Sequence, residues 1–250
     1  MSISRRDFCF GLLLCGAHQF FSSSVYAKDP RTWSQLATDN ALPIVQSLNT
    51  HPFVLGLADG TLSRDKFHFY LNQNIFYLES YAKTLGAVAK RLTSKQHRHR
   101  LERWQKETLL TRDWTTDLLS RSAGGNLPSD RTCAAVELYR SYEARLAAFG
   151  SLGEALAVIL PCFWVYEQVG LHVAKIRKTQ GNPYIEWIGG YGEPSYSQTV
   201  KQALGIADEY AQTASDAERL AMTRAFVKAC RMEALFFDAA WHQSLWPTNS

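Results

Sequence analysis

The stretch SRDKFHFYLNQNIFYLESYAKTLGAVAKRL, residues 63–92, decides the fold class of this chain. Its apolar residues recur at the three- and four-residue spacing of an α-helix, and it contains one glycine and no proline. Ser63 can accept a hydrogen bond from one of the backbone N–H groups that the start of a helix leaves unpaired. The stretch therefore predicts a long helix that begins just after Ser63 and ends near Leu92.

The same helical spacing covers most of the chain on both sides of this stretch. Clusters of Gly, Pro, Asn or Ser separate the further expected helices, which span residues 32–49, 94–122, 128–149, 154–179, 184–189, 194–213 and 215–245. We expect residues 51–62 to form a linker, because His51-Pro52 stops the first helix, and we expect Pro161 to kink the helix that contains it. The sequence thus predicts a single all-α domain, a bundle of about seven helices that buries its own core.

The composition agrees with a folded, water-soluble domain and argues against several classes of protein. The chain has 250 residues, of which 46 % are apolar and 20 % are charged, so disordered and fibrous proteins are excluded. Its 27 basic and 23 acidic residues give a formal charge of +4, and the basic residues are scattered along the chain. A nucleic-acid partner is therefore not expected.

The first 27 residues have the three parts of an export signal and are not expected to belong to the fold. Arg5 and Arg6 precede an apolar run, and the segment ends in the small-residue pattern Val-Tyr-Ala. The order Ser-Arg-Arg-Asp-Phe over residues 4–8 is typical of a twin-arginine signal, which directs folded proteins to a bacterial export machinery. We expect the mature protein, residues 28–250, to be periplasmic. No later run of about 18 apolar residues suggests a membrane-spanning helix.

Cys162 is the most informative candidate for chemistry in the mature chain. It lies next to Pro161 in an apolar stretch, and a cysteine in such a place is more often an inert core residue than a nucleophile. The mature chain also contains Cys133 and Cys230, which we expect to be structural. Because three is an odd number, at least one thiol should stay unpaired even in an oxidising compartment.

Polar residues that interrupt other apolar helices favour a functional role for this thiol. They are Asn74, Tyr77, Tyr139, Tyr142 and Glu233. A buried carboxyl at Glu233 must be paired or protonated, and burial raises its pKa into the range of a general acid. The alternative is a glutamate at the solvated edge of the last helix, and each tyrosine could equally be a core residue with a satisfied hydroxyl.

Metal or haem binding is not indicated, and we expect no cofactor. Carboxylate di-iron bundles place Glu and His three residues apart on one helix face, and no Glu-x-x-His occurs in this chain. His97 and His99 belong to a basic run that is typical of a surface, and the other histidines are isolated.

Four blocks of sequence resemble the TenA family, also called thiaminase II, over residues 32–241. The first is His51-Pro52-Phe53-Val54 with residues 56–62 and 67–70, Gln73 and Tyr77-Leu78. The others are Leu160-Pro161-Cys162-Phe163-Trp164-Val165-Tyr166, Tyr184 with Trp187-Ile188 and Tyr191, and Glu233 with Phe236-Phe237. The resemblance implies a haem-oxygenase-like helical bundle without haem, assembled as a homotetramer. It also implies hydrolysis of aminopyrimidines derived from thiamin, and cleavage of thiamin itself.

The resemblance assigns roles to individual residues. Cys162 is the expected nucleophile, and Glu233 is the expected acid and base at the pyrimidine ring nitrogen. Tyr139 and Tyr166 match family positions near the thiol and the leaving group. The residues that we expect to bind substrate are Asn74, Tyr77, Tyr142 and Tyr191.

Asn74 departs from the family pattern, in which an aspartate at this position binds the amino group and ring of the pyrimidine. An asparagine carries no charge and offers an N–H group where the carboxylate offers a lone pair. Two alternatives to a hydrolase therefore stay open. One is a protein that binds thiamin or its pyrimidine without reacting. The other is an oxidase of the related pyrroloquinoline-quinone maturation type.

Overall fold

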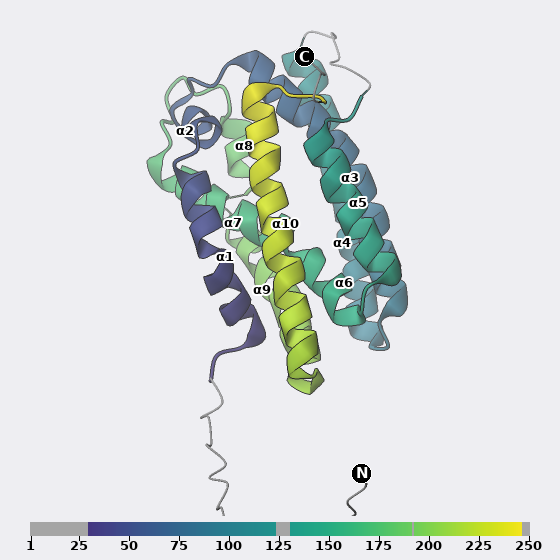
Figure 1. Ribbon diagram of the computed structural model, residues 1–250. Coiled ribbons are helices and arrows are strands. Elements are labelled where there is room, and N and C mark those ends of the chain that lie inside the picture. Colours follow the sequence, from purple (N-terminus) through teal and green to yellow (C-terminus); the bar gives the residue numbers. More distant parts are fainter. Residues whose placement is uncertain (1–29, 124–130, 192, 247–250) are drawn as a thin grey trace, which may run out of the picture. The chain divides into compact units, whose positions relative to one another are not determined.

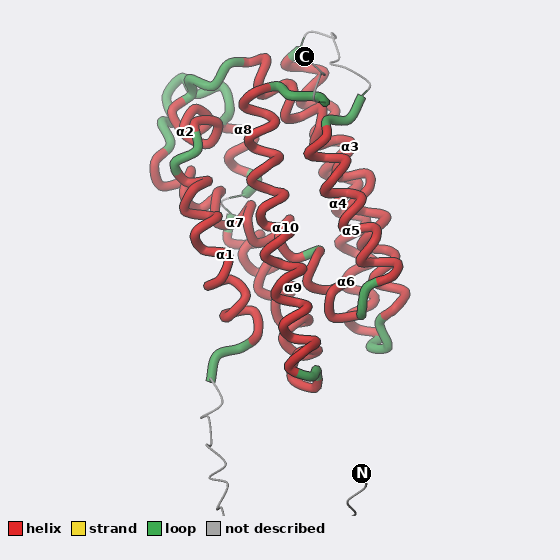
Figure 2. Tube along the Cα trace, viewed as in Figure 1, coloured by secondary structure: helices red, strands yellow, loops and turns green. Residues whose placement is uncertain are grey.

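The computed structural model describes residues 30–123, 131–191 and 193–246, and these ranges contain helices and no strand (Figure 2). Arg31–Ser250 form one compact unit. The helices are α1 Trp33–Asn49, α2 Pro52–Asp59, α3 Arg64–Arg91, α4 Lys95–Ser122, α5 Ala134–Phe149, α6 Leu152–Val158, α7 Leu160–Ile176, α8 Ile185–Gly189, α9 Pro194–Thr213 and α10 Asp216–His242. The all-α prediction is confirmed. The predicted export signal lies outside the described residues.

Side-chain caps start several of the long helices where the sequence predicts them. The Ser63 hydroxyl accepts from the Lys66 N–H at 3.4 Å, and α3 follows directly. Ser94 and Ser215 cap α4 and α10 in the same way. Each cap pairs a backbone N–H group that would otherwise lack a partner, so local sequence alone is enough to place these helix starts.

The prediction of a linker over residues 51–62 is wrong, because most of that segment is the helix α2. Pro52 takes the first helical position, where its missing N–H costs nothing and its fixed φ angle suits a helix. The His51 ring accepts from the Phe53 N–H at 3.1 Å, and Gly60 ends the helix at φ 80°, in the left-handed region. His51-Pro52 therefore ends α1 and also starts α2.

The helix expected from residue 128 begins later, at Ala134. Its predicted start at Pro128 lies outside the described residues, but residues 131–133 are described and are not helical. Two hydrogen bonds from the Gln73 side chain hold this segment on α3. The Gln73 amide donates to the Arg131 carbonyl at 3.0 Å and accepts from the Cys133 N–H at 2.7 Å. A contact between distant parts of the chain thus sets this helix start.

The single kinked helix predicted over residues 154–179 is two helices, α6 and α7, which meet at Ile159. Pro161 lies in the first turn of α7, where a proline is tolerated. The Ile159 carbonyl accepts from the Tyr81 hydroxyl at 2.7 Å. Leu152–Ile176 is long and apolar enough to cross a membrane by length and composition, and 72 % of its most apolar window is buried inside the fold. This burial is typical of a core helix in a bundle.

The long helices pack side by side, with α3 against α4 and α5, and α10 against α1, α5, α6 and α7 (Figure 1). Aromatic rings fill the core between α2, α3 and α10. The Tyr70 ring stacks on Phe236 with ring centres 5.2 Å apart, and it also contacts Phe53 and Phe237. This packing fixes the faces that α3, α7 and α10 present to one another.

Candidate active site

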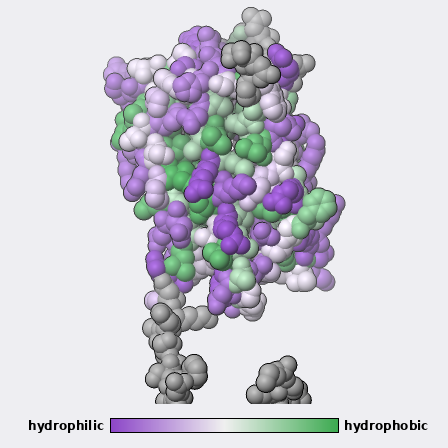
Figure 3. Space-filling model, viewed as in Figure 1, coloured by the Kyte–Doolittle hydropathy of each residue, from purple (hydrophilic) through white to green (hydrophobic). Residues whose placement is uncertain are grey.

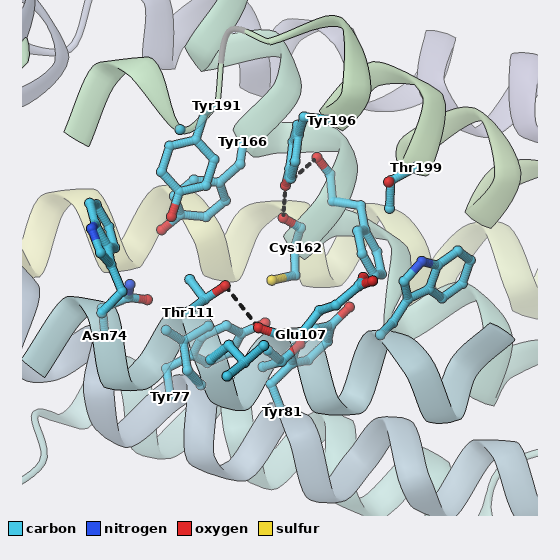
Figure 4. A pocket seen from close by; sticks show the side chains of 17 residues that line it. Asn74, Tyr77, Tyr81, Glu107, Thr111, Cys162, Tyr166, Tyr191, Tyr196 and Thr199 are labelled. Carbon is cyan, nitrogen blue, oxygen red and sulfur yellow. Dashed lines mark hydrogen bonds between the residues drawn. The ribbon is translucent and has the colours of Figure 1, made fainter. Parts of the chain in front are cut away.

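A cavity of about 450 Å³ opens beside this core. Its volume suits a small organic molecule. Residues from α3, α4, α7 and α9 and from the end of α8 line it (Figure 4). Of the residues predicted from sequence, Asn74, Tyr77, Cys162, Tyr166 and Tyr191 are at its wall. They come from positions up to 117 residues apart in the chain, as Asn74 and Tyr191 show.

Cys162 lies in the first turn of α7, and Figure 4 shows its sulfur between Tyr166 and Tyr191 on one side and Tyr77 and Tyr81 on the other. Burial raises the pKa of the Cys162 thiol well above its ordinary value, and the nearby Glu233 carboxyl raises this pKa further. The Tyr77 and Tyr81 hydroxyls act in the opposite direction. The Cys162 side chain is therefore a neutral thiol at neutral pH. Within the described residues, Cys133, Cys162 and Cys230 are all free.

Glu233 is fully buried on α10 and is not among the residues that line the cavity. The Tyr139 hydroxyl donates to Glu233 Oε1 at 2.9 Å, and Glu233 Oε2 has no hydrogen-bond partner among the described residues. Burial raises the pKa of Glu233 from 4.5 to about 8, and the Tyr139 hydrogen bond offsets part of that rise. Glu233 is therefore mostly protonated at neutral pH and can act as an acid. The alternative of a solvated edge position is excluded.

Tyr139 connects Glu233 to the cavity through ring stacking. It is 1 % exposed, and its ring stacks on Tyr77 with centres 4.9 Å apart. Tyr77 in turn forms part of the cavity wall. The structure thus places Cys162, Tyr77, Tyr139 and Glu233 in one region of the fold.

Tyr166 and Tyr191 form an aromatic pair on the opposite side of the thiol. Their ring centres are 5.1 Å apart, and the Tyr166 hydroxyl accepts from Tyr70 at 3.0 Å. A Cβ atom added at Gly170 would lie 2.7 Å from both the Cβ and the carbonyl oxygen of Tyr191. Only a glycine at this position of α7 lets Tyr191 approach so closely.

The expectation that Tyr142 binds substrate is not supported, because this residue does not line the cavity. Its ring lies under the Lys228 ammonium, 4.7 Å from the ring centre, and near the Arg145 guanidinium. Tyr139 and Glu143 are fully buried on α5, whereas Tyr142 is only partly buried.

Glu143 is a functional candidate that the sequence analysis missed. It is fully buried, and its Oε1 accepts from the Tyr77 hydroxyl at 3.0 Å. Its position four residues after Tyr139 was the available signal, but such spacing is common on any helix. Further missed lining residues are Tyr81, Trp104, Glu107, Trp114 and Tyr196.

The arrangement places a nucleophile at the wall of a small cavity and a buried acid behind that wall. Asn74 adds an amide that can both donate and accept hydrogen bonds, without a charge. No group of three or more His, Cys, Asp or Glu side chains in the described ranges is placed to hold a metal ion. The expectation of a metal-free site stays a prediction.

Comparison with known proteins gives the family. The TENA/THI-4/PQQC family model matches residues 38–112 and 125–243. A Bacillus subtilis protein named aminopyrimidine aminohydrolase is 32 % identical over 80 % of this chain and 86 % of its own. A protein of the same name from Halalkalibacterium halodurans is 27 % identical over 84 % of this chain and 96 % of its own.

Solved structures support the fold. A TenA homologue from Pyrococcus furiosus superposes with a TM-score of 0.78 at 16 % identity, over 83 % of this chain and 99 % of its own. A Shewanella denitrificans domain described as having a heme oxygenase-like fold gives 0.63 at 12 % identity, over 86 % of this chain and 94 % of its own. The fold is therefore haem-oxygenase-like, and the chain belongs to the TENA/THI-4/PQQC family.

Proposed function

We propose that this protein is an aminopyrimidine aminohydrolase of thiamin salvage, which releases ammonia from 4-amino-5-aminomethyl-2-methylpyrimidine and also cleaves thiamin. The observation that carries the proposal is the free Cys162 thiol in a 450 Å³ cavity that is backed by the protonated Glu233. The two relatives named aminopyrimidine aminohydrolase support it, because the matches extend over most of both chains.

The site supports addition of Cys162 to the pyrimidine ring, followed by loss of the substituent. The sulfur forms a bond to a ring carbon, and Glu233 gives its proton to a ring nitrogen. This proton neutralises the negative charge that develops on the nitrogen, and the charge passes to the Glu233 carboxylate. The amine then leaves the exocyclic methylene with the former thiol proton. Water then adds its hydroxyl to the same carbon and its proton passes to the sulfur as the carbon–sulfur bond breaks, while Glu233 recovers its proton from the ring nitrogen. Tyr166 and Tyr191 lie beside the thiol, where they can orient this water.

The proposal is tested by measuring ammonia and pyrimidine-alcohol release from 4-amino-5-aminomethyl-2-methylpyrimidine by residues 28–250. Thiamin is assayed in parallel for release of its thiazole. We expect turnover of the aminomethyl compound. Folded protein that releases no product from either compound would refute a hydrolase function.

A binding protein is the second candidate, and Asn74 is the observation that favours it. This uncharged amide lines the cavity where the family pattern has an aspartate, and a mismatch of donors and acceptors weakens recognition of a polar ligand strongly. A binding protein would hold the pyrimidine with equal affinity in the wild type and in Cys162→Ala, and neither would form product.

We further propose that the protein is exported to the periplasm and works there as a homotetramer. The twin-arginine pattern supports the first part. Exposed large apolar side chains support the second, and Figure 3 shows apolar patches among polar side chains on one face. The exposed residues include Leu42, Leu138, Phe149, Leu220 and Leu235. The double variant Arg5→Lys, Arg6→Lys tests export, and we expect it to stay in the cytoplasmic fraction. Light scattering of residues 28–250 tests the assembly, and we expect a mass four times that of one chain.

A further inference from the structure

Glu143 is a buried carboxyl for which the proposed reaction has no use. It is 0 % exposed, and burial raises its pKa well above the ordinary value. The Tyr77 hydroxyl donates to its Oε1 at 3.0 Å, and its Oε2 has no hydrogen-bond partner among the described residues. An apolar side chain would fill this space without the cost of burying a carboxyl. Glu143 has two tyrosine neighbours, Tyr77 and Tyr139, and of these Tyr77 lines the cavity.

The Tyr77 hydroxyl is also a neighbour of the thiol. Tyr77 lines the cavity with Cys162, and a hydrogen bond donated from its hydroxyl to the sulfur lowers the pKa of Cys162. Glu143 and Cys162 therefore compete for the same proton. A tyrosine hydroxyl has one proton to donate and lone pairs that accept. While Tyr77 donates to Glu143, its oxygen can present only lone pairs to Cys162 and to a ligand.

Two further hydroxyls at the cavity wall donate their protons to the backbone. Tyr81 donates to the Ile159 carbonyl at 2.7 Å. Tyr196 donates to the carbonyls of Cys162 and Phe163 at 3.3 and 3.2 Å, as Figure 4 shows. The wall around the thiol is therefore rich in acceptors. Tyr166 accepts from Tyr70 and so keeps its own proton.

We propose that Glu143 is a positioning residue that competes with Cys162 for the proton of the Tyr77 hydroxyl. While this hydroxyl donates to Glu143, it faces the cavity as an acceptor and favours ligands that bring N–H donors. An amino group on the ligand supplies such N–H donors. For the identity of the ligand, the inference rests on the proposed function. The effect of Glu143 on the Cys162 thiol does not rest on that function, because this effect needs no ligand.

The first test is alkylation of Cys162 by iodoacetamide at pH 7, with the site identified by peptide mass spectrometry. In Glu143→Leu the Tyr77 hydroxyl is released and can donate to the thiolate. This hydrogen bond stabilises the thiolate, which is the form that reacts with iodoacetamide. A hydrogen bond to a charged group is strong enough to raise the thiolate fraction, and with it the alkylation rate, about tenfold. Glu143→Gln keeps an acceptor oxygen for Tyr77, so it should react like the wild type. In a Tyr77→Phe background, Glu143→Leu should change nothing.

The matched control is Glu137→Gln on the same helix. Glu137 pairs with Arg140 outside the cavity, so its replacement should leave the alkylation rate unchanged. Circular dichroism checks the fold, and Glu143→Met replaces the leucine variant if that variant does not fold. Equal alkylation rates in the wild type and Glu143→Leu would overturn the inference. So would the same acceleration in the Tyr77→Phe background.

Binding of two ligands extends the test to specificity. The probes are 4-amino-5-hydroxymethyl-2-methylpyrimidine and its 4-oxo counterpart, which has a carbonyl in place of the amine. Calorimetry should show at least about tenfold tighter binding of the amino compound to the wild type, and a smaller ratio for Glu143→Leu. An unchanged ratio overturns the specificity part. Failure of both probes to bind the wild type contradicts the proposed function, while the alkylation rates still decide the role of Glu143.

Discussion

Cys162→Ala lowers kcat for 4-amino-5-aminomethyl-2-methylpyrimidine by at least about a thousandfold, because the variant has no group to form the bond to the ring. The fold should survive. Cys162 is at the wall of an existing cavity, so loss of the sulfur enlarges that cavity and does not create a closed void. We expect the melting temperature to change by less than about 3 °C.

Steady-state ammonia release and a thermal melt of the same samples check this result. Cys230→Ala is the control, because Cys230 is buried on α10 and does not line the cavity. It should keep its activity and lose stability. Retention of more than a tenth of wild-type activity by Cys162→Ala would exclude the thiol as the nucleophile.

Glu233→Gln should lower kcat about a hundredfold or more and at the same time stabilise the protein. An amide cannot give a proton to the ring nitrogen, so the acid step is lost. In the wild type, burial raises the pKa of Glu233 to about 8, so the acid function is present below pH 8 and declines above it. The variant should lack this alkaline decline in the activity that remains.

The stability effect depends on pH, and its sign follows from the same pKa. Between pH 4.5 and 8 the unfolded chain has lost the Glu233 proton, while the folded chain keeps it. The unfolded state therefore binds fewer protons, and the stability of the wild type falls as the pH rises through this interval. A shift from 4.5 to about 8 is worth at most roughly 5 kcal/mol.

Thermal melts of both proteins at pH 5 and pH 8 measure this difference. The advantage of Glu233→Gln should be small at pH 5 and should grow to several kcal/mol at pH 8. Glu218→Gln is the control, since Glu218 lies in the first turn of the same helix and is only partly buried. A difference that does not grow with pH would show that Glu233 keeps an ordinary pKa.

Most of the fold was predictable because its signals are local. Ser63 and Ser94 start α3 and α4 through hydrogen bonds that reach three residues along the chain. The apolar period then continues each helix without help from elsewhere. The segment 51–62 was missed because a proline after a helix also suits the first turn of the next helix.

The sequence by itself determined the all-α class, the family resemblance, and the types of residue that the site needs, among them Cys162 and Glu233. It did not determine which polar residues meet. Tyr142 looked equivalent to Tyr139 in sequence, and the packing of α5 turned it toward Lys228. Glu143 had no distinguishing signal in the sequence, and the same packing placed it against Tyr77.

Only the tertiary structure decided those contacts and the proton states that follow from them. The partner and the burial of a side chain depend on how whole helices pack. Successive side chains lie about 100° apart around a helix axis, so a small rotation of the helix changes which of them point into the core. Burial then moves the pKa of Glu233 from 4.5 to about 8. That shift comes from removing water around the carboxyl, which no pattern along the chain records.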